Sequence, residues 1–289
     1  MKVAFLGTGL MGLPMANRLW ENGVNLTAYN RTPEKLELLK QKGIQVTTVP
    51  EQATRDADCI ILMLTNTMAI YSVLLSDTSW RTLAGKTVIQ MGTITPSESK
   101  QIQESITAAG GEYLEAPVLG SIPEAKAGKL IIMVGGQRQQ YQRYLELLKN
   151  FGSDPLLVGS VGSAAALKLA LNQLIVSLTS AFALSLGFLQ RQNVDIDAFM
   201  KILRESALYA PTFDKKLPRM LDENFENPNF PTKHLLKDTN LFIDEAENLG
   251  LDVSNLEALG GILDKAIKMS LANKDYSSLY SAITSVSEE

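Results

Sequence analysis

The chain has 289 residues, 45% of them hydrophobic, so it can form two domains of ordinary size with apolar cores. Its formal net charge is −4, which excludes a global basic field that would recruit nucleic acid or an anionic membrane. The single cysteine, Cys59, cannot form an intrachain disulfide and fits a reducing compartment. An apolar strand stands at the N-terminus in place of a signal peptide, so we expect a cytoplasmic protein.

A glycine-rich motif, Gly7-Thr8-Gly9-Leu10-Met11-Gly12, lies between a predicted strand at 3–6 and a helical stretch at 13–22. In this strand–turn–helix context the spacing predicts a dinucleotide-binding site. Gly7 permits the tight turn, Gly9 lets the backbone approach a pyrophosphate, and Gly12 lets the helix pack close to the strand. The helix N-terminus would face the phosphates. The alternative is a glycine-rich turn without a ligand.

The second predicted strand, 24–29, indicates which dinucleotide binds, because it ends in Asn30-Arg31-Thr32. An NAD site usually has Asp or Glu here, which bonds the ribose 2′-hydroxyl. This chain has no carboxylate to repel a 2′-phosphate, and Arg31 offers a guanidinium to bind it. The sequence therefore predicts NADPH as the cofactor.

Strand-like and helix-like stretches continue to alternate up to about residue 160. Alternation of this kind is typical of a mostly parallel, doubly wound α/β sheet, the Rossmann architecture. The run at 59–64 is apolar without alternation, as expected for a strand buried on both faces. The further predicted strands are 45–48, 87–90, 112–115 and 130–134, and two of the helices are 33–42 and 96–109.

After Gly162 the pattern becomes entirely helical. We therefore expect a nucleotide-binding domain at 1–162 and an all-helical domain for substrate binding and oligomerisation at 163–289, joined by a long helix. The Pro/Asn-rich piece 223–231 is predicted to be a loop. The predicted helices are 163–192, 196–206, 236–249, 254–273 and 278–286.

The stretch 169–189 contains no charged residue and is long enough to cross a bilayer. It also contains Asn172, Gln173 and several hydroxyl side chains, and no second such segment exists in the sequence. A helix buried between domains or subunits is the better interpretation, and we expect no membrane insertion. So long an apolar helix also predicts at least a dimer; the sequence does not choose between dimer and tetramer.

Lys168 and Asn172 lie four residues apart near the start of the long helix, which puts them on one face. The lysine interrupts the apolar run 164–171, an expensive place for a charge unless it is paired or used. Its ammonium could protonate a carbonyl oxygen as hydride reaches the carbon, and a neighbouring amide could hold either group in place. The alternative is a lysine whose stem packs while its head extends into water. The residues alone leave both open.

Four blocks of sequence follow one another along the chain. They are Gly7 to Ala16, Glu115-Ala116-Pro117-Val118-Leu119-Gly120-Ser121, Gly162 to Asn172, and Phe230-Pro231-Thr232-Lys233-His234-Leu235-Leu236-Lys237-Asp238. These blocks resemble the β-hydroxyacid dehydrogenase family, which includes 3-hydroxyisobutyrate dehydrogenase, tartronate semialdehyde reductase and the glyoxylate/succinic semialdehyde reductases. The last block is most similar to the glyoxylate/succinic semialdehyde branch.

The resemblance implies roles for individual residues. Lys168 would be the general acid, and Asn172 would position the lysine and the substrate. Thr93 would lie near both nicotinamide and substrate. The cofactor would contact Gly7, Gly9, Leu10, Met11, Gly12, Asn30, Arg31, Thr32, Leu64, Thr65, Thr93 and Lys237; the substrate would contact Thr93, Gly120, Ser121, Phe230 and Asp238. Without the resemblance, Phe230 would be interpreted as a core aromatic, and Lys237 and Asp238 as a solvated helix face.

Two residues depart from the family pattern, since the family usually has serine where this chain has Leu119 and Gly92. The lost hydroxyls could weaken the anchoring of a small acid, which leaves the identity of the substrate open. His234 is the only histidine and has no Cys/His/carboxylate cluster around it, so we expect a structural role and no metal site. Lys216, like Lys201, Lys215 and Arg219, is predicted to be an ordinary solvated charge.

Together these features predict NADPH-dependent reduction of a small anionic aldehyde, such as glyoxylate or succinic semialdehyde, to the hydroxy acid. Imine reductases share the expected architecture but usually lack the lysine, so Lys168 argues against that activity while Leu119 keeps it open. A third possibility is an NADPH-binding sensor without turnover, for which a lost catalytic lysine would be the expected sign.

Overall fold

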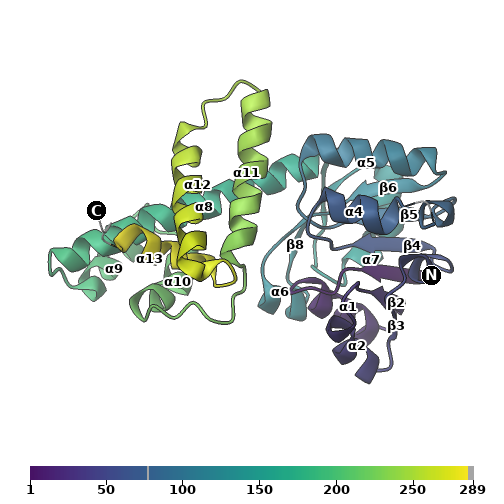
Figure 1. The fold of residues 1–289 in the computed structure, drawn as a ribbon, viewed down its shortest axis with the longest axis horizontal. Coiled ribbons are helices and arrows are strands. Elements are labelled where there is room, and N and C mark those ends of the chain that lie inside the picture. The colour runs from purple at the N-terminus through teal and green to yellow at the C-terminus, as the bar shows by residue number, and fades with distance from the viewer. Residues whose placement is uncertain (77, 286–289) are drawn as a thin grey trace. The chain divides into compact units, whose positions relative to one another are not determined.

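The computed structural model describes residues 1–76 and 78–285. The chain forms two compact units, Met1–Lys168 and Leu169–Glu289. In Figure 1 the first unit is coloured purple to teal and contains the sheet, and the second runs from teal through green to yellow and is helical. Each unit is described by itself below.

The first unit is built on a mostly parallel sheet with the strand order β3-β2-β1-β4-β5-β6-β8-β7, and β9 pairs with β8. The predicted doubly wound α/β fold is thereby confirmed. Pairing is parallel from β3 across to β6, whereas β8 runs antiparallel to both β6 and β7. The strands are β1 (Lys2–Leu6), β2 (Asn25–Tyr29), β3 (Gln45–Thr47), β4 (Cys59–Leu62), β5 (Thr87–Gln90), β6 (Glu112–Glu115), β7 (Val118–Leu119), β8 (Ile131–Gly135) and β9 (Leu156–Gly159).

Helices cover both faces of this sheet, so the side chains of strand β1 point alternately into two separate apolar cores. Val3 and Phe5 of β1 pack in one apolar cluster, whereas Ala4 and Leu6 pack in the other. Period-two alternation sends successive side chains to opposite faces, so both faces of β1 are buried. The helices are α1 (Gly12–Glu21), η1 (Pro33–Leu36), α2 (Glu37–Gln41), α3 (Pro50–Thr54), α4 (Thr67–Leu74), η2 (Trp80–Thr82), α5 (Pro96–Ala108), α6 (Ile122–Ala127) and α7 (Arg138–Leu148).

The strand order reverses direction between β1 and β4, since the chain first moves outward through β2 and β3 and then returns to β4. In doubly wound sheets, ligands bind beyond the carboxyl ends of the strands at this reversal. The segments that follow β1, β4 and β5 all leave the sheet at that same edge, because these strands are parallel.

Among the described residues, the second unit contains helices and loops, with one isolated bridge between Pro231 and Asp275. Its core is one cluster that includes Phe182, Phe213 and Leu263. Phe182 and Phe213 stack with ring centroids 4.6 Å apart. The helices are α8 (Ser163–Arg191), which begins in the first unit, α9 (Ile196–Glu205), α10 (Pro211–Leu221), α11 (Thr232–Asn248), α12 (Ser254–Ala266), η3 (Ile267–Leu271), η4 (Tyr276–Ser278) and α13 (Leu279–Thr284).

The predicted elements differ from the observed ones in several places. Helix α10 was not predicted, because Pro211 and Pro218 lie within it, but its buried face of Phe213, Lys216 and Met220 holds it in place. The predicted helix 254–273 is interrupted where Ser270 has a φ of 65°. Helix α11 begins four residues before the predicted start at 236. Strands β7 and β9 were missed, and residue 286 of the last predicted helix lies outside the described residues.

Helix α8 is the one helix in the described parts of the chain that is long and apolar enough to span a membrane by length and composition. Within the structure, 44% of its most apolar window is buried.

Candidate functional site

The glycine-rich loop after β1 has the shape that a pyrophosphate requires. Gly7 has a φ of +105°, and a Cβ atom there would collide with the carbonyl oxygen of Met63. A Cβ atom at Gly12 would collide with the carbonyl oxygen of Gly7, so the start of α1 packs tightly on the turn. A Cβ atom at Gly9 would have nothing within 4 Å. Two glycines are therefore needed for close packing, and the third leaves open space beside the N-terminus of α1.

Asn30 connects this loop to the segment after β2. Its Nδ2 donates to Thr8 Oγ1 at 3.0 Å, and its Oδ1 accepts from the backbone N–H of Thr32 at 3.0 Å. Thr8 Oγ1 in turn donates to the carbonyl oxygen of Lys35 at 3.1 Å. Arg31 lies between these fixed residues with an exposed side chain.

The segment after β5 is fixed by the buried side chain of Gln90, the last residue of that strand. Its Oε1 accepts from the N–H of Gly92 at 3.1 Å, and its Nε2 donates to the Gly92 carbonyl at 3.3 Å. A Cβ atom on Gly92 would lie 2.6 Å from the carbonyl oxygen of Leu64. The glycine at position 92 therefore permits a close backbone approach that a serine would obstruct. Thr93 is half-buried just beyond this contact, and Thr65 is exposed.

Gly120 and Ser121 lie between β7 and α6, and both reach the surface of the first unit. The Ser121 hydroxyl donates to Glu124 Oε2 at 2.6 Å, and the Ser121 backbone N–H donates to the same oxygen at 2.9 Å. These bonds fix the start of α6. The hydroxyl proton of Ser121 is thus used within the protein. Leu119 is half-buried in the short strand β7.

Lys168 lies in the second turn of α8 and is 8% exposed. This burial does not fit a lysine whose head extends into water. The first turn of α8 lies beside the carboxyl end of β6, since Glu115 accepts hydrogen bonds from backbone N–H groups there. Because β6 runs parallel to β5, and β5 to β4, Lys168 lies at the same edge of the sheet as the glycine-rich loop and Thr93.

In the second unit, the structure brings together Asn172, Lys237 and Asp238. Asn172 Nδ2 donates to Asp238 Oδ2 at 2.7 Å, and the two residues are 2% and 3% exposed. Asp238 Oδ1 pairs with Lys237 Nζ at 2.8 Å. Asn172 Oδ1 is buried without a hydrogen-bond partner among the described residues, so it is an acceptor that a ligand could satisfy. The burial of Asp238 excludes the alternative that this residue lies on a solvated helix face.

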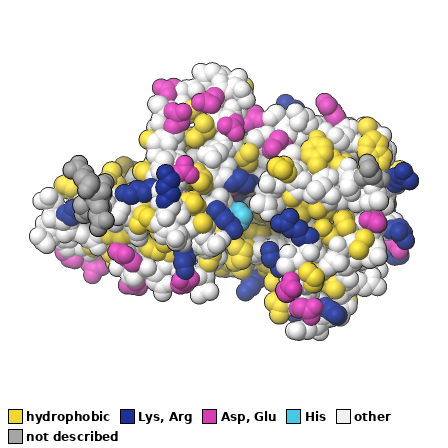
Figure 2. Space-filling model, in the orientation of Figure 1, with side chains coloured by type: hydrophobic (Ala, Val, Ile, Leu, Met, Phe, Trp, Pro, Cys, Tyr) yellow, Lys and Arg dark blue, Asp and Glu magenta, His cyan; other side chains and the backbone are white. Residues whose placement is uncertain are grey.

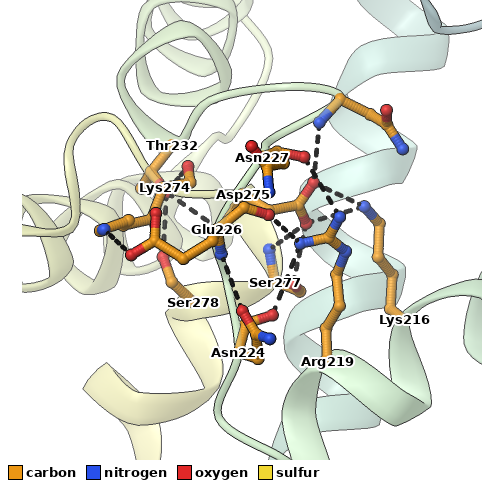
Figure 3. A network of polar contacts seen from close by, with 11 residues as sticks. Lys216, Arg219, Asn224, Glu226, Asn227, Thr232, Lys274, Asp275, Ser277 and Ser278 are labelled. Atoms are coloured by element: carbon orange, nitrogen blue, oxygen red, sulfur yellow. Dashed lines mark hydrogen bonds and ion pairs between the residues drawn. The ribbon is translucent and has the colours of Figure 1, made fainter.

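Phe230 precedes α11 and is supported by Tyr276, whose ring meets it edge-on with centroids 5.8 Å apart. The Tyr276 backbone N–H also donates to the Phe230 carbonyl at 3.0 Å. Next to Tyr276, Asp275 anchors the loop by accepting from the Asn229 backbone N–H at 3.3 Å and from the Ser277 hydroxyl at 2.8 Å. Figure 3 shows this network, which joins α10, the loop before α11, and the chain after η3.

The prediction that Lys216 is a solvated charge is wrong. Its ammonium lies 2.7 Å from Asp275 Oδ1 and 4.1 Å from the centre of the Tyr276 ring, and the residue is 7% exposed. Burial alone would raise the pKa of Asp275, but the Lys216 charge and the Ser277 donors outweigh it and hold that pKa below its usual value. No local pattern indicated this burial, because Lys215 and Arg219 flank Lys216 in a charged stretch and its partner lies far along the chain.

His234 is partly buried, and burial, with some help from Lys233 and Lys237, lowers its pKa below the usual value. Across the described residues, no group of three or more His, Cys, Asp or Glu side chains is arranged to hold a metal ion.

Comparison with known proteins assigns both parts of the chain. Residues 2–162 match the NAD-binding domain of 6-phosphogluconate dehydrogenase, and residues 162–283 match the NAD-binding domain of NADP-dependent 3-hydroxyisobutyrate dehydrogenase. The chain belongs to the β-hydroxyacid dehydrogenase family. It is accordingly an NAD(P)-dependent oxidoreductase of the hydroxyacid dehydrogenase type, and the resemblance that the sequence motifs indicated is confirmed.

One relative and two solved structures illustrate what this chain is similar to. Glyoxylate/succinic semialdehyde reductase 1 of Arabidopsis thaliana is 30% identical over 98% of both chains. The structure of 3-hydroxyisobutyrate dehydrogenase from Mycobacterium tuberculosis with L-serine has a TM-score of 0.89 at 20% identity, and covers 98% of this chain and 99% of its own. An imine reductase from Myxococcus stipitatus with NADP+ has a TM-score of 0.68 at 19% identity over 96% and 98% of the two chains. The two structures share the fold with this member of the β-hydroxyacid dehydrogenase family.

Proposed function

We propose that this protein uses NADPH to reduce a small aldehyde acid, such as glyoxylate or succinic semialdehyde, to the corresponding hydroxy acid. The observation that carries the proposal is the buried Lys168, one turn before Asn172 on the same helix, at the edge of the sheet where the glycine-rich loop lies. The similarity to a glyoxylate/succinic semialdehyde reductase supports this substrate class. We assign cofactor binding to a domain at 1–162 and substrate binding to a domain at 163–289.

A bound reduced nicotinamide supplies the hydride that reaches the carbonyl carbon. The protein's own task is then to neutralise the negative charge that develops on the carbonyl oxygen. Lys168 donates a proton to that oxygen, and its ammonium attracts the oxygen before the proton moves. Asn172 presents its unpaired Oδ1, held in place by the bond from its Nδ2 to Asp238. This oxygen can accept a hydrogen bond from the lysine or from the product hydroxyl.

The substrate carboxylate is assigned to the stretch Gly120–Ser121 and to the half-buried Thr93. Because the hydroxyl and the backbone N–H of Ser121 both donate to Glu124 Oε2, the Gly120 backbone N–H and Thr93 become the main donors. Leu119 and Phe230 then add apolar surface beside the chain of the substrate. This combination favours an acid with a methylene chain, such as succinic semialdehyde, over one as short as glyoxylate.

The preference for NADPH is assigned to Arg31 and Thr32. The Asn30 bonds to Thr8 and Thr32 hold the segment that presents them. Leu10, Met11, Leu64 and Thr65 are assigned to the rest of the cofactor, and Lys237 to the nicotinamide end.

Imine reduction is the second candidate, because an imine reductase shares the fold. An imine already carries a basic nitrogen, so a buried lysine would have little to add. A non-catalytic NADPH sensor is the third, and the buried Lys168 argues against it.

The experiment is NADPH oxidation by the purified protein across aldehyde acids, α-keto acids, neutral aldehydes and cyclic imines, with NADH in parallel. Turnover of succinic semialdehyde or glyoxylate at least tenfold above that of butanal, a neutral control, is expected. Faster turnover of cyclic imines would favour the second candidate. NADPH binding without oxidation of any of these compounds would favour the sensor.

We also propose a cytoplasmic homo-oligomer, a dimer or a tetramer. The second unit exposes apolar side chains along α8, where Leu174, Leu184 and Phe188 are 47%, 62% and 61% exposed. Apolar side chains also stand between charged ones on the surface of this unit in Figure 2. Light scattering after gel filtration tests the subunit count, and Leu184→Glu combined with Phe188→Glu is expected to shift the protein toward monomer. A monomeric unmutated protein would contradict this.

A further inference from the structure

Glu115, the last residue of β6, is 1% exposed and acts as a cap for another element. Its Oε1 accepts from the backbone N–H groups of Gly162 and Ala164, each at 2.8 Å, and of Ala165 at 3.3 Å. These donors belong to the first turn of α8 and the residue before it. A helix leaves its first N–H groups without intrahelical partners, and buried ones must find acceptors elsewhere. One carboxylate oxygen, supplied by a distant strand, meets that need here.

The carboxylate itself is fixed from two other sides. Its Oε2 accepts from the Ser99 hydroxyl on α5 at 2.6 Å, and Ser99 Oγ lies 2.9 Å from the Tyr113 hydroxyl. On the neighbouring strand β8, Gly135 is paired with Glu115, and a Cβ atom there would collide with the carboxylate. Burial raises the pKa of Glu115, while Ser99 and the three backbone donors each act to lower it.

The helix start that Glu115 holds is the segment that carries Lys168. From Ala165 to Lys168 the helix rises by about 4.5 Å, at about 1.5 Å per residue. Side chains in a helix tilt toward its N-terminus, so Lys168 leans toward the turn that Glu115 caps. A shift or fraying of that turn would therefore move the lysine, whereas the cofactor residues after β1 and β2 stand on other elements.

We propose that Glu115 is a positioning residue for Lys168: it joins the end of β6 to the start of α8 and thereby sets the place of the general acid. The inference rests on the proposed function of Lys168. Glu115 is the first residue of the stretch from Glu115 to Ser121, and its proposed role is separate from substrate binding.

The test compares Glu115→Ala with Glu115→Gln. Alanine removes the acceptor for three backbone N–H groups, whereas the glutamine oxygen can still accept them. For Glu115→Ala we expect kcat to fall about ten- to a hundredfold, the range expected when a reacting group is misplaced by an ångström or less. NADPH affinity should change less than about twofold, and Glu115→Gln should recover most of the lost turnover. Tyr113→Phe is the control, because it removes one hydroxyl from the network and keeps all three helix bonds.

Two further measurements separate positioning from general damage. Amide hydrogen exchange over residues 160–168 should accelerate in Glu115→Ala and stay slow in Glu115→Gln and Tyr113→Phe. In a Lys168→Ala background, Glu115→Ala should cause no further fall in kcat, because a positioning residue has nothing left to position. If Glu115→Ala does not fold, the same comparison with and without Lys168→Ala can be made with Glu115→Asp, since the shorter side chain withdraws the carboxylate from α8.

The outcomes distinguish this inference from the proposed function. Unchanged exchange at the start of α8, an equal loss of kcat with and without Lys168, or a parallel loss of NADPH affinity would each overturn the role of Glu115. Full turnover in Lys168→Ala alone would instead overturn the proposed general acid, and the exchange measurement would still report whether Glu115 holds the helix.

Discussion

Asn172 Nδ2 lies 2.7 Å from Asp238 Oδ2, a hydrogen bond that joins α8 to α11 inside the helical unit. A carboxylate can only accept, so the amide nitrogen must face Asp238 and the amide oxygen must face away from it. Asp238 thereby determines the orientation of Asn172. The ion pair between Lys237 and the other oxygen of Asp238 holds the carboxylate in place.

Asn172→Asp should destabilise the protein in a pH-dependent way. Two buried carboxylates at this separation cannot both ionise, so the folded state raises the pKa of one of them above its value in the unfolded chain. The destabilisation relative to wild type is therefore largest above that raised pKa and shrinks as the pH falls and a proton is shared. Thermal unfolding at pH 5 and pH 8 measures it, with Asn172→Ala as the uncharged control. Equal deficits at both pH values would contradict the expected orientation.

Sequence patterns predicted the elements that local periodicity and motif spacing control. The glycine-rich turn, the apolar strand β4 and the long helix α8 are each specified by neighbouring residues. The bonds from Asn172 to Asp238 and from Lys216 to Asp275 span distant parts of the chain, and no local pattern reveals them. The same holds for Glu115, whose partners at the start of α8 lie 47 to 50 residues further along the chain. Local chemistry thus predicted the glycine-rich loop, Arg31, Lys168 and Asn172, and the family resemblance added the other candidate residues. Tertiary packing decided which of them are held by other side chains.

Gly92→Ser would restore the residue that the family usually has, yet we expect it to destabilise this protein. The added Cβ atom would lie 2.6 Å from the Leu64 carbonyl, and the backbone segments after β4 and β5 would have to move apart. Overpacking of this kind costs about 1–3 kcal/mol. Thermal or urea unfolding measures the loss, and Gly261→Ser, where a Cβ atom meets nothing within 4 Å, is the control. A variant as stable as wild type would show that the segments can separate freely.

Arg31→Asp should change the cofactor preference from NADPH toward NADH. The substitution replaces an attractive guanidinium by a carboxylate that repels the 2′-phosphate. We expect the KM for NADPH to rise about ten- to a hundredfold, while the KM for NADH falls or stays constant. Arg138→Asp makes the same charge change at the exposed start of α7 and should leave both values unchanged. Equal use of the two cofactors by the unmutated protein would refute the assignment.

Lys216→Met should lower stability by about 3–5 kcal/mol at neutral pH, because it leaves the Asp275 carboxylate buried without its counter-charge. In the wild type the pKa of Asp275 is held below its ordinary value, so the pairing stabilises the fold above the unfolded pKa of about 3.9. That stability is lost as the pH falls through the folded pKa. In Lys216→Met, burial without the counter-charge raises the pKa of Asp275, so the carboxylate takes up a proton as the pH falls. The deficit of the variant should therefore be large at pH 7 and smaller at pH 4 in urea unfolding. Lys215→Met is the neighbouring control, and a deficit that is independent of pH would contradict the ion-pair argument.

Lys168→Ala should reduce kcat far more than NADPH affinity, because a general acid acts on the transition state and not on the bound cofactor. General acid catalysis contributes about 10²–10⁴-fold, and a lost oxygen-binding group adds to the fall. Lys168→Arg should not rescue turnover, since a guanidinium keeps the charge but barely releases a proton at ordinary pH. The fold should persist, because alanine favours helix and a costly buried charge is removed. Steady-state kinetics and NADPH titration on the folded variants measure both effects. If a variant retains more than about a tenth of wild-type turnover, the loss is much smaller than expected. That result would mean that a group other than Lys168 donates the proton.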